Sequence, residues 1–170
     1  MMKKFAFLLP VLALLLGGCA GYHVGPIQPK IMEGIKSISV PSFKNKTLIP
    51  RLEVLTADIV IRQIQQDGTY QIASNDTADA VIEGTILSVS RNGLRSLREN
   101  VLTTTEFNVT VMIRYRLVRR STGEEIESRS VSGSTSFYTG EDPNEGERQA
   151  IPLAIQNAAV RLVSQISEGW

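Results

Sequence analysis

Cys19 is the only cysteine in the chain, and the residues before it indicate what chemistry its thiol can undergo. It follows Leu16-Gly17-Gly18, which places two small residues at the end of an apolar run. This order matches a bacterial lipobox, in which small residues let an extended chain enter the peptidase and the thiol accepts a diacylglycerol before cleavage. The alternative is an ordinary secreted protein with a free thiol, but an unpaired cysteine is a liability in an oxidising compartment. We therefore expect Cys19 to be lipidated.

The residues before the cysteine, 1–18, are expected to form a signal peptide that is cleaved. Lys3 and Lys4 precede the apolar stretch Phe5 to Leu16, and this charged, apolar, small-residue order is typical of a secretory signal. The apolar stretch is too short to span a membrane, because crossing a bilayer as a helix takes about 20 apolar residues.

Acyl chains on Cys19 would anchor the mature chain, since stable anchoring needs about two chains or equivalent signals. Ala20 follows the cysteine. In enterobacteria an aspartate at that position favours retention in the inner membrane. We therefore expect an outer-membrane protein that is lipid-anchored on the periplasmic side.

Three arginines form a second candidate site, for ligand binding. Arg91, Arg95 and Arg98 surround Asn92-Gly93, a pair that we expect to turn a hairpin between two long strands. Guanidinium groups offer paired donors to phosphate, and the leucines nearby could meet an acyl chain or another apolar surface. A phosphorylated glycolipid is one candidate ligand, and the alternative is a solvated hairpin that binds nothing.

Catalytic and metal-binding patterns are missing from the sequence. His23 is the only histidine and lies close to the lipidation site, so no histidine is placed to act as a base for a serine or cysteine. The chain has no His/Cys metal cluster, no phosphate-binding Gly-Lys-Ser/Thr loop and no Gly-x-Ser-x-Gly motif. Carboxylates could still converge, for example Glu83, Glu99 and Glu106. We expect no enzyme, no cofactor and no metal.

The charge balance weighs against nucleic acid as a partner. Without the signal peptide the chain keeps 16 basic and 17 acidic residues, a net charge near −1. The charges are segregated, since residues 91–120 carry a local +5 and residues 121–147 a local −6.

A mature chain of 152 residues is long enough for one domain with a sizeable core and too short for two. Residues 19–34, with Pro26 and Pro29, lack periodicity and are expected to be the lipidated N-terminus and a tether. Residues 35–170 are then expected to form a single domain.

Hydrophobic periodicity predicts the elements of that domain. The clearest pattern is an alternation over residues 107–117, which predicts a half-buried strand. Its apolar members are Phe107, Val109, Val111, Ile113, Tyr115 and Leu117, and the residues between them are Asn108, Thr110, Met112, Arg114 and Arg116. In the first half of the domain we expect a strand at 35–40 with a turn-rich exit at 42–47, and then a helix at 51–67 between Pro50 and Gly68. A short strand at 70–73 and a longer strand at 80–90 follow, and after the strand around 107–117 we expect a turn at 121–124 and a returning strand at 125–137. The last element is a helix from near Glu147 to near Gly169, with Pro152 in its first turn.

The first helix is amphipathic and lies between two strands, so it must cover a sheet. The last helix has a similar apolar stripe and must cover the same apolar face. A strand-helix-strand crossover favours a parallel pair, whereas the 107–137 hairpin is antiparallel. The fold class is therefore predicted to be α+β, a two-layer sandwich with two helices packed on one face of a mixed four- to five-stranded sheet. The returning strand is poor in bulky apolar residues, so we expect it at a sheet edge or against a partner.

Three segments carry a resemblance to a known family. They are Cys19 to Val24 with its Gly-Tyr-His, Ile35 to Thr47 with its Pro-x-Phe-x-Asn strand exit, and Ala78 to Ile86 with its Ala-Asp-x-x-x-x-Gly strand. In this order the segments resemble the lipopolysaccharide-assembly lipoproteins of the LptE family, over nearly the whole mature chain. The resemblance implies a two-helix, four-stranded sandwich.

The same resemblance implies a function and partners. Members of the LptE family sit as a plug inside LptD, a large outer-membrane β-barrel translocon, help that barrel assemble, and assist insertion of lipopolysaccharide into the outer leaflet. Basic residues of the family contact lipopolysaccharide, but Arg91, Arg95 and Arg98 are chosen here from their charge alone. A second group with similar strand exits, the curli-type secretion pore subunits and penicillin-binding-protein activators, is the alternative. A pore would need long alternating membrane hairpins, and only 107–137 comes close.

Overall fold

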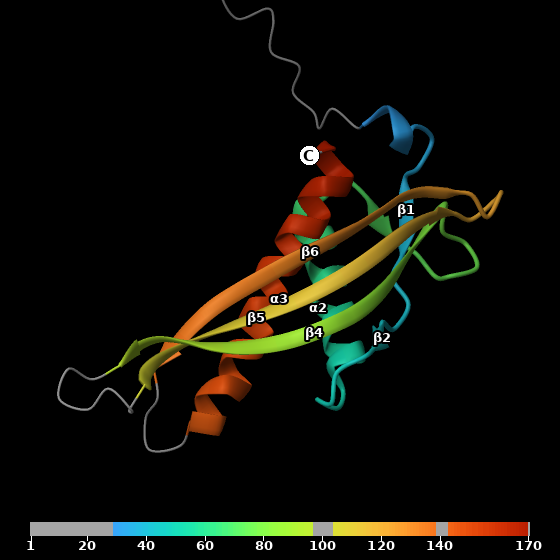
Figure 1. Ribbon diagram of the computed structural model, residues 1–170. Helices are drawn as coiled ribbons and strands as arrows, with labels where there is room; N and C mark the ends of the chain where they lie inside the picture. The colour runs from blue at the N-terminus through green and yellow to red at the C-terminus, as the bar shows by residue number, and fades with distance from the viewer. Residues whose placement is uncertain (1–28, 97–103, 139–142, 170) are drawn as a thin grey trace, which may run out of the picture.

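The computed structural model describes residues 29–96, 104–138 and 143–169. Within these ranges the chain forms one sheet, two long helices and a single turn of 3-10 helix (Figure 1). In chain order the elements are η2 (Lys30–Met32), β1 (Ser37–Ser39), β2 (Lys44–Asn45), α2 (Leu52–Asp67), β3 (Gln71–Ile72), β4 (Ala80–Ser96), β5 (Thr104–Arg119), β6 (Glu125–Tyr138) and α3 (Pro143–Glu168).

The sheet is mixed, as its connections predict. Its strand order is β3-β1-β4-β5-β6, with β2 paired to β4 outside this path. β1 runs parallel to β3 and β4, whereas β5 runs antiparallel to both of its neighbours, β4 and β6. The expected four to five strands are too few, because the sheet has six. The missed strand is β2, whose two residues lie in the expected turn-rich exit and are too few to show alternation.

Both long helices lie on the same face of the sheet (Figure 1). In the described part of the chain no helix covers the opposite face, which is called the open face below. α3 packs against β5 and β6, and α2 lies beside α3 and over the β2–β4 region. Side chains from both layers are fully buried between them, for example Ile64 of α2, Ile113 of β5 and Leu162 of α3. This arrangement confirms the α+β class with two helices on one face.

The alternation along β5 places its apolar side chains toward the helices. The fully buried residues of this strand are those that the alternation predicted: Val109, Val111, Ile113, Tyr115 and Leu117. Met112, which lies between two of them in sequence, is 41% exposed. A strand with one apolar and one polar face fits a sheet that is covered on one side only.

β6 is an edge strand, as its composition predicted. Its lack of bulky side chains has a structural reason, because α3 crosses it at very short range. A β-carbon at Gly133 would lie 2.1 Å from the carbonyl oxygen of Ala154 and 2.2 Å from the backbone nitrogen of Ala158. Only a glycine therefore allows the backbone of α3 to approach β6 this closely.

Side chains of α3 also protect the free edge of β6. Asn157 Nδ2 donates to the carbonyl oxygen of Ser134, and Arg161 Nη1 donates to that of Ser132, both at 2.9 Å. These carbonyls would otherwise be open to pairing with another strand.

The two helices differ in how well the sequence predicted their ends. α2 ends at Gly68, which adopts φ 76° and donates its N–H to the Ile64 carbonyl at 3.0 Å, as expected for a C-terminal glycine. α3 begins at Pro143, before the expected start near Glu147. Pro152 therefore lies inside the helix, and the prediction that it occupies the first turn is wrong.

The described part of the N-terminal segment is packed on the domain. Met32 of η2 is fully buried in the core, so the packed region begins before residue 35, where we expected it to begin. No helix among the described residues combines the length and the apolar character that a membrane span requires.

Candidate functional site

The predicted arginine site lies at one end of the sheet, where β4 and β6 end and β5 begins. We call this the distal end, and it is at the lower left of Figure 1. The expected turn at Asn92-Gly93 is wrong, because β4 continues through both residues to Ser96. Asn92 pairs with Asn108 and Gly93 with Phe107.

An irregular strand replaces the expected turn. The β4–β5 register shifts between Gly93 and Arg95 and again between Arg95 and Ser96. A glycine inside a strand often marks such a bulge, which bends the strand and redirects its side chains. The Asn-Gly pair was misleading because the β4–β5 pairing extends past it, and the connection between the strands falls at 97–103, outside the described residues.

Arg91 contacts the side chains of Glu147 and Phe107, and Phe107 stacks on Phe137. We call these four residues the distal cluster. Arg91 Nη1 donates to Glu147 Oε2 at 2.7 Å, so this strand is tied to the start of α3. The guanidinium carbon lies 5.2 Å from the centroid of the Phe107 ring. That ring stacks on Phe137, with 5.8 Å between centroids and 22° between planes.

The geometry leaves Arg91 available to a ligand. Its side chain is 40% exposed and that of Glu147 is 26% exposed, so the ion pair is in contact with water and contributes little to stability. The aromatic ring fixes the direction of the guanidinium without using its hydrogen-bond donors. An incoming phosphate would therefore have to compete with one carboxylate for a guanidinium that is already oriented.

Apolar side chains are exposed beside the distal cluster. Leu94, in the irregular part of β4, is 58% exposed, and Tyr138, at the end of β6, is 68% exposed. An amphipathic ligand with an anionic group and an apolar part would find both kinds of contact at this end of the sheet.

The other predicted site residues have different outcomes. Arg95 lies on β4 opposite Glu106, four residues beyond Arg91. Arg98 lies outside the described residues, as do Cys19 and the proposed signal peptide. The structure therefore places Arg91 and Arg95 on the same strand, and the clustering of all three arginines stays a prediction.

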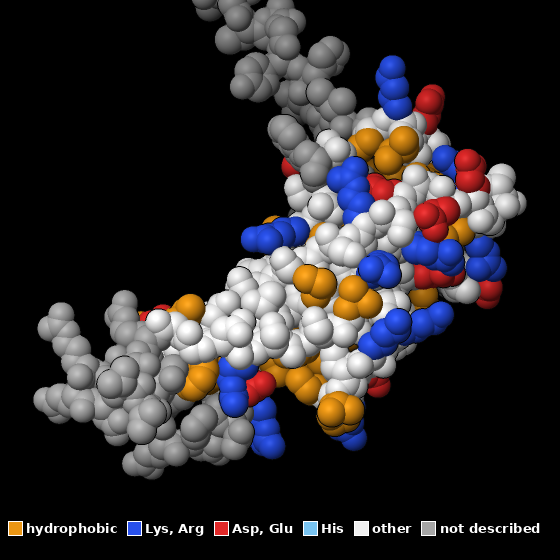
Figure 2. All heavy atoms as spheres, in the orientation of Figure 1, with side chains coloured by type: hydrophobic (Ala, Val, Ile, Leu, Met, Phe, Trp, Pro, Cys, Tyr) orange, Lys and Arg blue, Asp and Glu red, His pale blue; other side chains and the backbone are white. Residues whose placement is uncertain are grey.

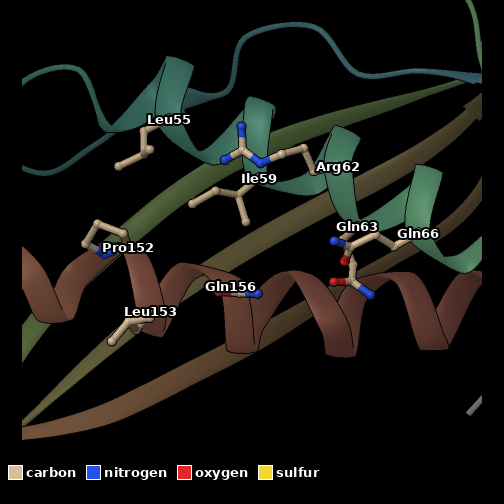
Figure 3. A pocket seen from close by; sticks show the side chains of 8 residues that line it. All are labelled: Leu55, Ile59, Arg62, Gln63, Gln66, Pro152, Leu153 and Gln156. Carbon is tan, nitrogen blue, oxygen red and sulfur yellow. The ribbon is translucent and has the colours of Figure 1, made fainter.

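A hollow of about 180 Å³ lies between α2 and α3 (Figure 3). Its apolar lining includes Ile59 of α2 and Pro152 of α3, and its polar lining consists of Arg62 and the amides of Gln63, Gln66 and Gln156. This lining has no carboxylate, histidine or cysteine, so it supplies no general base or nucleophile.

Tyr115 of β5 is an ionisable side chain that is fully buried between the sheet and the helices. Its hydroxyl is hydrogen-bonded to Glu127 Oε1 at 3.2 Å and to Gln165 Oε1 at 3.0 Å. Burial, followed by the negative charge of Glu127, raises the pKa of Tyr115 well above its usual range. The hydroxyl therefore stays protonated and connects β5 and β6 to α3 as a structural contact.

The described residues contain no group of three or more His, Cys, Asp or Glu that could hold a metal ion. Sequence reasoning found Arg91 from its charge but missed Glu147 and the two phenylalanines. Phe107 was recognised only as part of the alternating strand. No sequence signal connects Glu147 with a residue 56 positions earlier, because only the crossing of α3 brings them together.

Comparison with known families gives one match that spans most of the chain. The model of the family described as LptE, lipopolysaccharide-assembly, matches residues 35–166. This range includes β1 through all but the last two residues of α3. No curated protein sequence matches the chain.

Several solved structures share the fold. A minor lipoprotein from Acinetobacter baumannii has a TM-score of 0.55 at 19% identity, covering 79% of this chain and 94% of that one. A PelC dodecamer from Paraburkholderia phytofirmans has a TM-score of 0.53 at 14% identity, and the match covers 78% of this chain and 89% of the PelC chain. A Xanthomonas campestris protein has a TM-score of 0.57 at 13% identity, and the match covers 85% of this chain and 90% of that protein's chain. At these identities the likeness shows a common fold and does not assign a function.

Proposed function

We propose that this chain, which belongs to the LptE lipopolysaccharide-assembly family, is an outer-membrane lipoprotein that acts as plug and assembly partner of an LptD-like β-barrel and assists insertion of lipopolysaccharide into the outer leaflet. The observation that carries the proposal is the extent of the family match, because it covers every strand of the described sheet, α2 and all but the last two residues of α3. Such a function needs a shaped surface and no catalytic group.

The proposed anchor is a lipid on Cys19. The sequence places this residue directly after Leu16-Gly17-Gly18 and ten residues before Pro29, where the described chain begins. Ten residues span at most about 35 Å when fully extended, so the domain would stay close to the membrane surface.

The proposed site for lipopolysaccharide is the distal cluster. A phosphate group of the lipid would replace Glu147 as the partner of Arg91, and Leu94 and Tyr138 would meet its apolar part. Arg and phosphate form two parallel hydrogen bonds, which gives such a contact both energy and direction. Arg95 and Arg98 remain part of this proposal through their charge and position in sequence.

Co-purification from the native host tests the partnership. The full chain, tagged at its C-terminus and extracted in mild detergent, should bring down a large β-barrel whose electrophoretic mobility changes on heating. An unrelated tagged lipoprotein of the same membrane is the control and should not retain that barrel.

Two other outcomes would contradict the proposal and identify the alternatives. A ring made only of copies of this chain would favour a secretion pore subunit. Recovery of a peptidoglycan synthase without the barrel would favour an activator of that enzyme.

A further inference from the structure

The open face of the sheet carries a row of aligned polar side chains. Lys44 of β2 is the register partner of Thr85 in β4, and Thr85 is the register partner of Arg114 in β5. Arg114 is in turn aligned with Ser130 of β6. Side chains of directly paired residues lie on the same face of a sheet, so two cations flank one hydroxyl. Figure 2 shows several Lys and Arg side chains on this side of the molecule, with Asp and Glu side chains among them.

The row borders a hollow of about 350 Å³. Lys44, Thr85 and Arg114 all line it, together with the neighbouring residues Glu83 and Arg116. The hollow is open to solvent and has room for a phosphate group and the first atoms attached to it.

Lys44 is held in position by its two neighbours. Phe43 is buried with its ring against Gly84, and Asn45 Nδ2 donates to the Ile49 carbonyl at 2.8 Å. Successive residues of a strand point to opposite faces. Because Phe43 is fixed in the core, Lys44 must extend over the open face, and little conformational freedom of its backbone remains to be lost on binding.

Among the residues that the structure describes, the two cations of this row have no ion-pair partner. Arg116, one row away, is paired with Glu83 at 2.6 Å and Glu125 at 3.5 Å, and the hydrogen bond that it donates to Glu83 raises the pKa of Arg116. Glu83 is thereby engaged by Arg116. Within residues 29–96, 104–138 and 143–169, no acidic side chain forms an ion pair with Lys44 or Arg114.

We propose that Lys44, Thr85 and Arg114 form a binding site for the phosphate group of a small phosphorylated ligand. The backbones of β2 and β5 lie about 10 Å apart, two strand spacings, which lets the two long side chains reach a group above β4 from both sides. The guanidinium supplies paired donors and the ammonium a point charge, while the hydroxyl of Thr85 lies between them. A phosphate monoester carries a charge of about −1.5 to −2, which balances the charge of two cations. A carboxylate carries a single negative charge and would balance only one of them.

This site is separate from the distal cluster. Arg91 extends toward α3 on the helix-covered face, whereas Lys44 and Arg114 lie on the open face. The proposal therefore does not depend on the proposed function, and failure of one leaves the other standing.

Equilibrium dialysis of the purified full chain in mild detergent tests the site, with inorganic phosphate and glucose 1-phosphate as separate probes. Lys44→Gln and Arg114→Gln should each weaken binding by about tenfold, the loss expected when one charge-assisted contact is removed. Arg62→Gln is the control, because it removes the same charge from an exposed position of α2 that does not line this hollow, and it should change binding less than twofold. The unfolding midpoints of all three variants are measured to show that they are folded.

The two probes distinguish the source of the phosphate. Tighter binding of glucose 1-phosphate assigns the site to a sugar-phosphate group, and equal binding of both probes assigns it to the free anion. Absence of saturable binding by the wild-type chain overturns the proposal, and so does an equal loss of affinity in all three variants, which would indicate only a diffuse positive field.

Discussion

The ring of Phe43 lies directly against the backbone of Gly84, so that a β-carbon at residue 84 would come within 2.2 Å of the phenyl Cε2 atom. Phe43 belongs to the segment 35–47 and Gly84 to the segment 78–86, two of the three segments that carry the family resemblance. Their residue types are therefore explained by a contact that each makes with the other.

Replacing this glycine should destabilise the protein. Gly84→Ala inserts a methyl group into the space of the Phe43 ring, and overpacking of a core typically costs about 1–3 kcal/mol. The free energy of unfolding, measured in urea, should fall by this amount.

A second substitution tests whether the ring is the cause. Gly84→Ala combined with Phe43→Leu should lose less stability than the sum of the two single variants, because the smaller side chain leaves room for the methyl group. Strictly additive losses would contradict the contact.

Gly133 should tolerate alanine even less well. Its neighbours are backbone atoms of α3, at 2.1 Å from the Ala154 oxygen and 2.2 Å from the Ala158 nitrogen, and a helix backbone cannot be moved aside as a side chain can. Gly133→Ala should therefore lower the urea midpoint more than Gly84→Ala does. Ser136→Ala, at an exposed position of the same strand, is the control and should change stability by less than about 0.5 kcal/mol. A smaller effect at Gly133 than at Gly84 would contradict the close approach of α3.

Asp79 links the start of β4 to β1 and makes stability depend on pH. Its Oδ2 accepts hydrogen bonds from the backbone N–H groups of Lys36 and Ser37, at 3.0 and 2.9 Å, and from the Ser37 hydroxyl at 2.8 Å. These bonds, the one from the Lys36 N–H first, lower the pKa of Asp79 below its usual value. A lowered pKa in the folded state stabilises the protein above the unfolded pKa of about 3.9, and this stabilisation is lost as pH falls through the folded value.

Asp79→Asn should therefore be less stable than the wild type at neutral pH, and the difference in unfolding free energy should shrink below about pH 4. Asp76→Asn removes a nearby carboxylate that is 90% exposed and 3.4 Å from Arg120, a kind of ion pair that contributes little, and it serves as the matched control. A difference for Asp79→Asn that stays constant down to the lowest pH would contradict this role of the carboxylate.

The long elements with a periodic pattern of apolar residues were predictable from the sequence. Short elements, and features that depend on contacts with other parts of the fold, were not. Alternation over eleven residues identified the buried face of β5, and Gly68 identified the end of α2, because both signals are local. β2 has two residues and is defined only by its pairing with β4. Pro152 was misplaced because the packing of a long helix on β6 overrides the local cost of one missing hydrogen bond.

The candidate site was predictable only as a set of charges. Arg91 was identified, but its partner Glu147 belongs to α3, and the contact depends on how that helix crosses the sheet. Lys44 and Arg114 were not singled out as a pair, because their alignment follows from the register of three strands. Sequence patterns predict which face a residue occupies more readily than which residues of other elements it meets.

Lipopolysaccharide binding by paired variants tests the role of the distal cluster most directly. If a phosphate replaces Glu147 at Arg91, then Arg91→Gln should weaken the binding of purified lipopolysaccharide to the full chain by about tenfold, whereas Glu147→Gln should strengthen it, because the competing carboxylate is gone. Arg116→Gln, which removes an equal charge from the open face, should leave the affinity unchanged. Wild-type affinity in Arg91→Gln, or weaker binding by Glu147→Gln, would contradict the account.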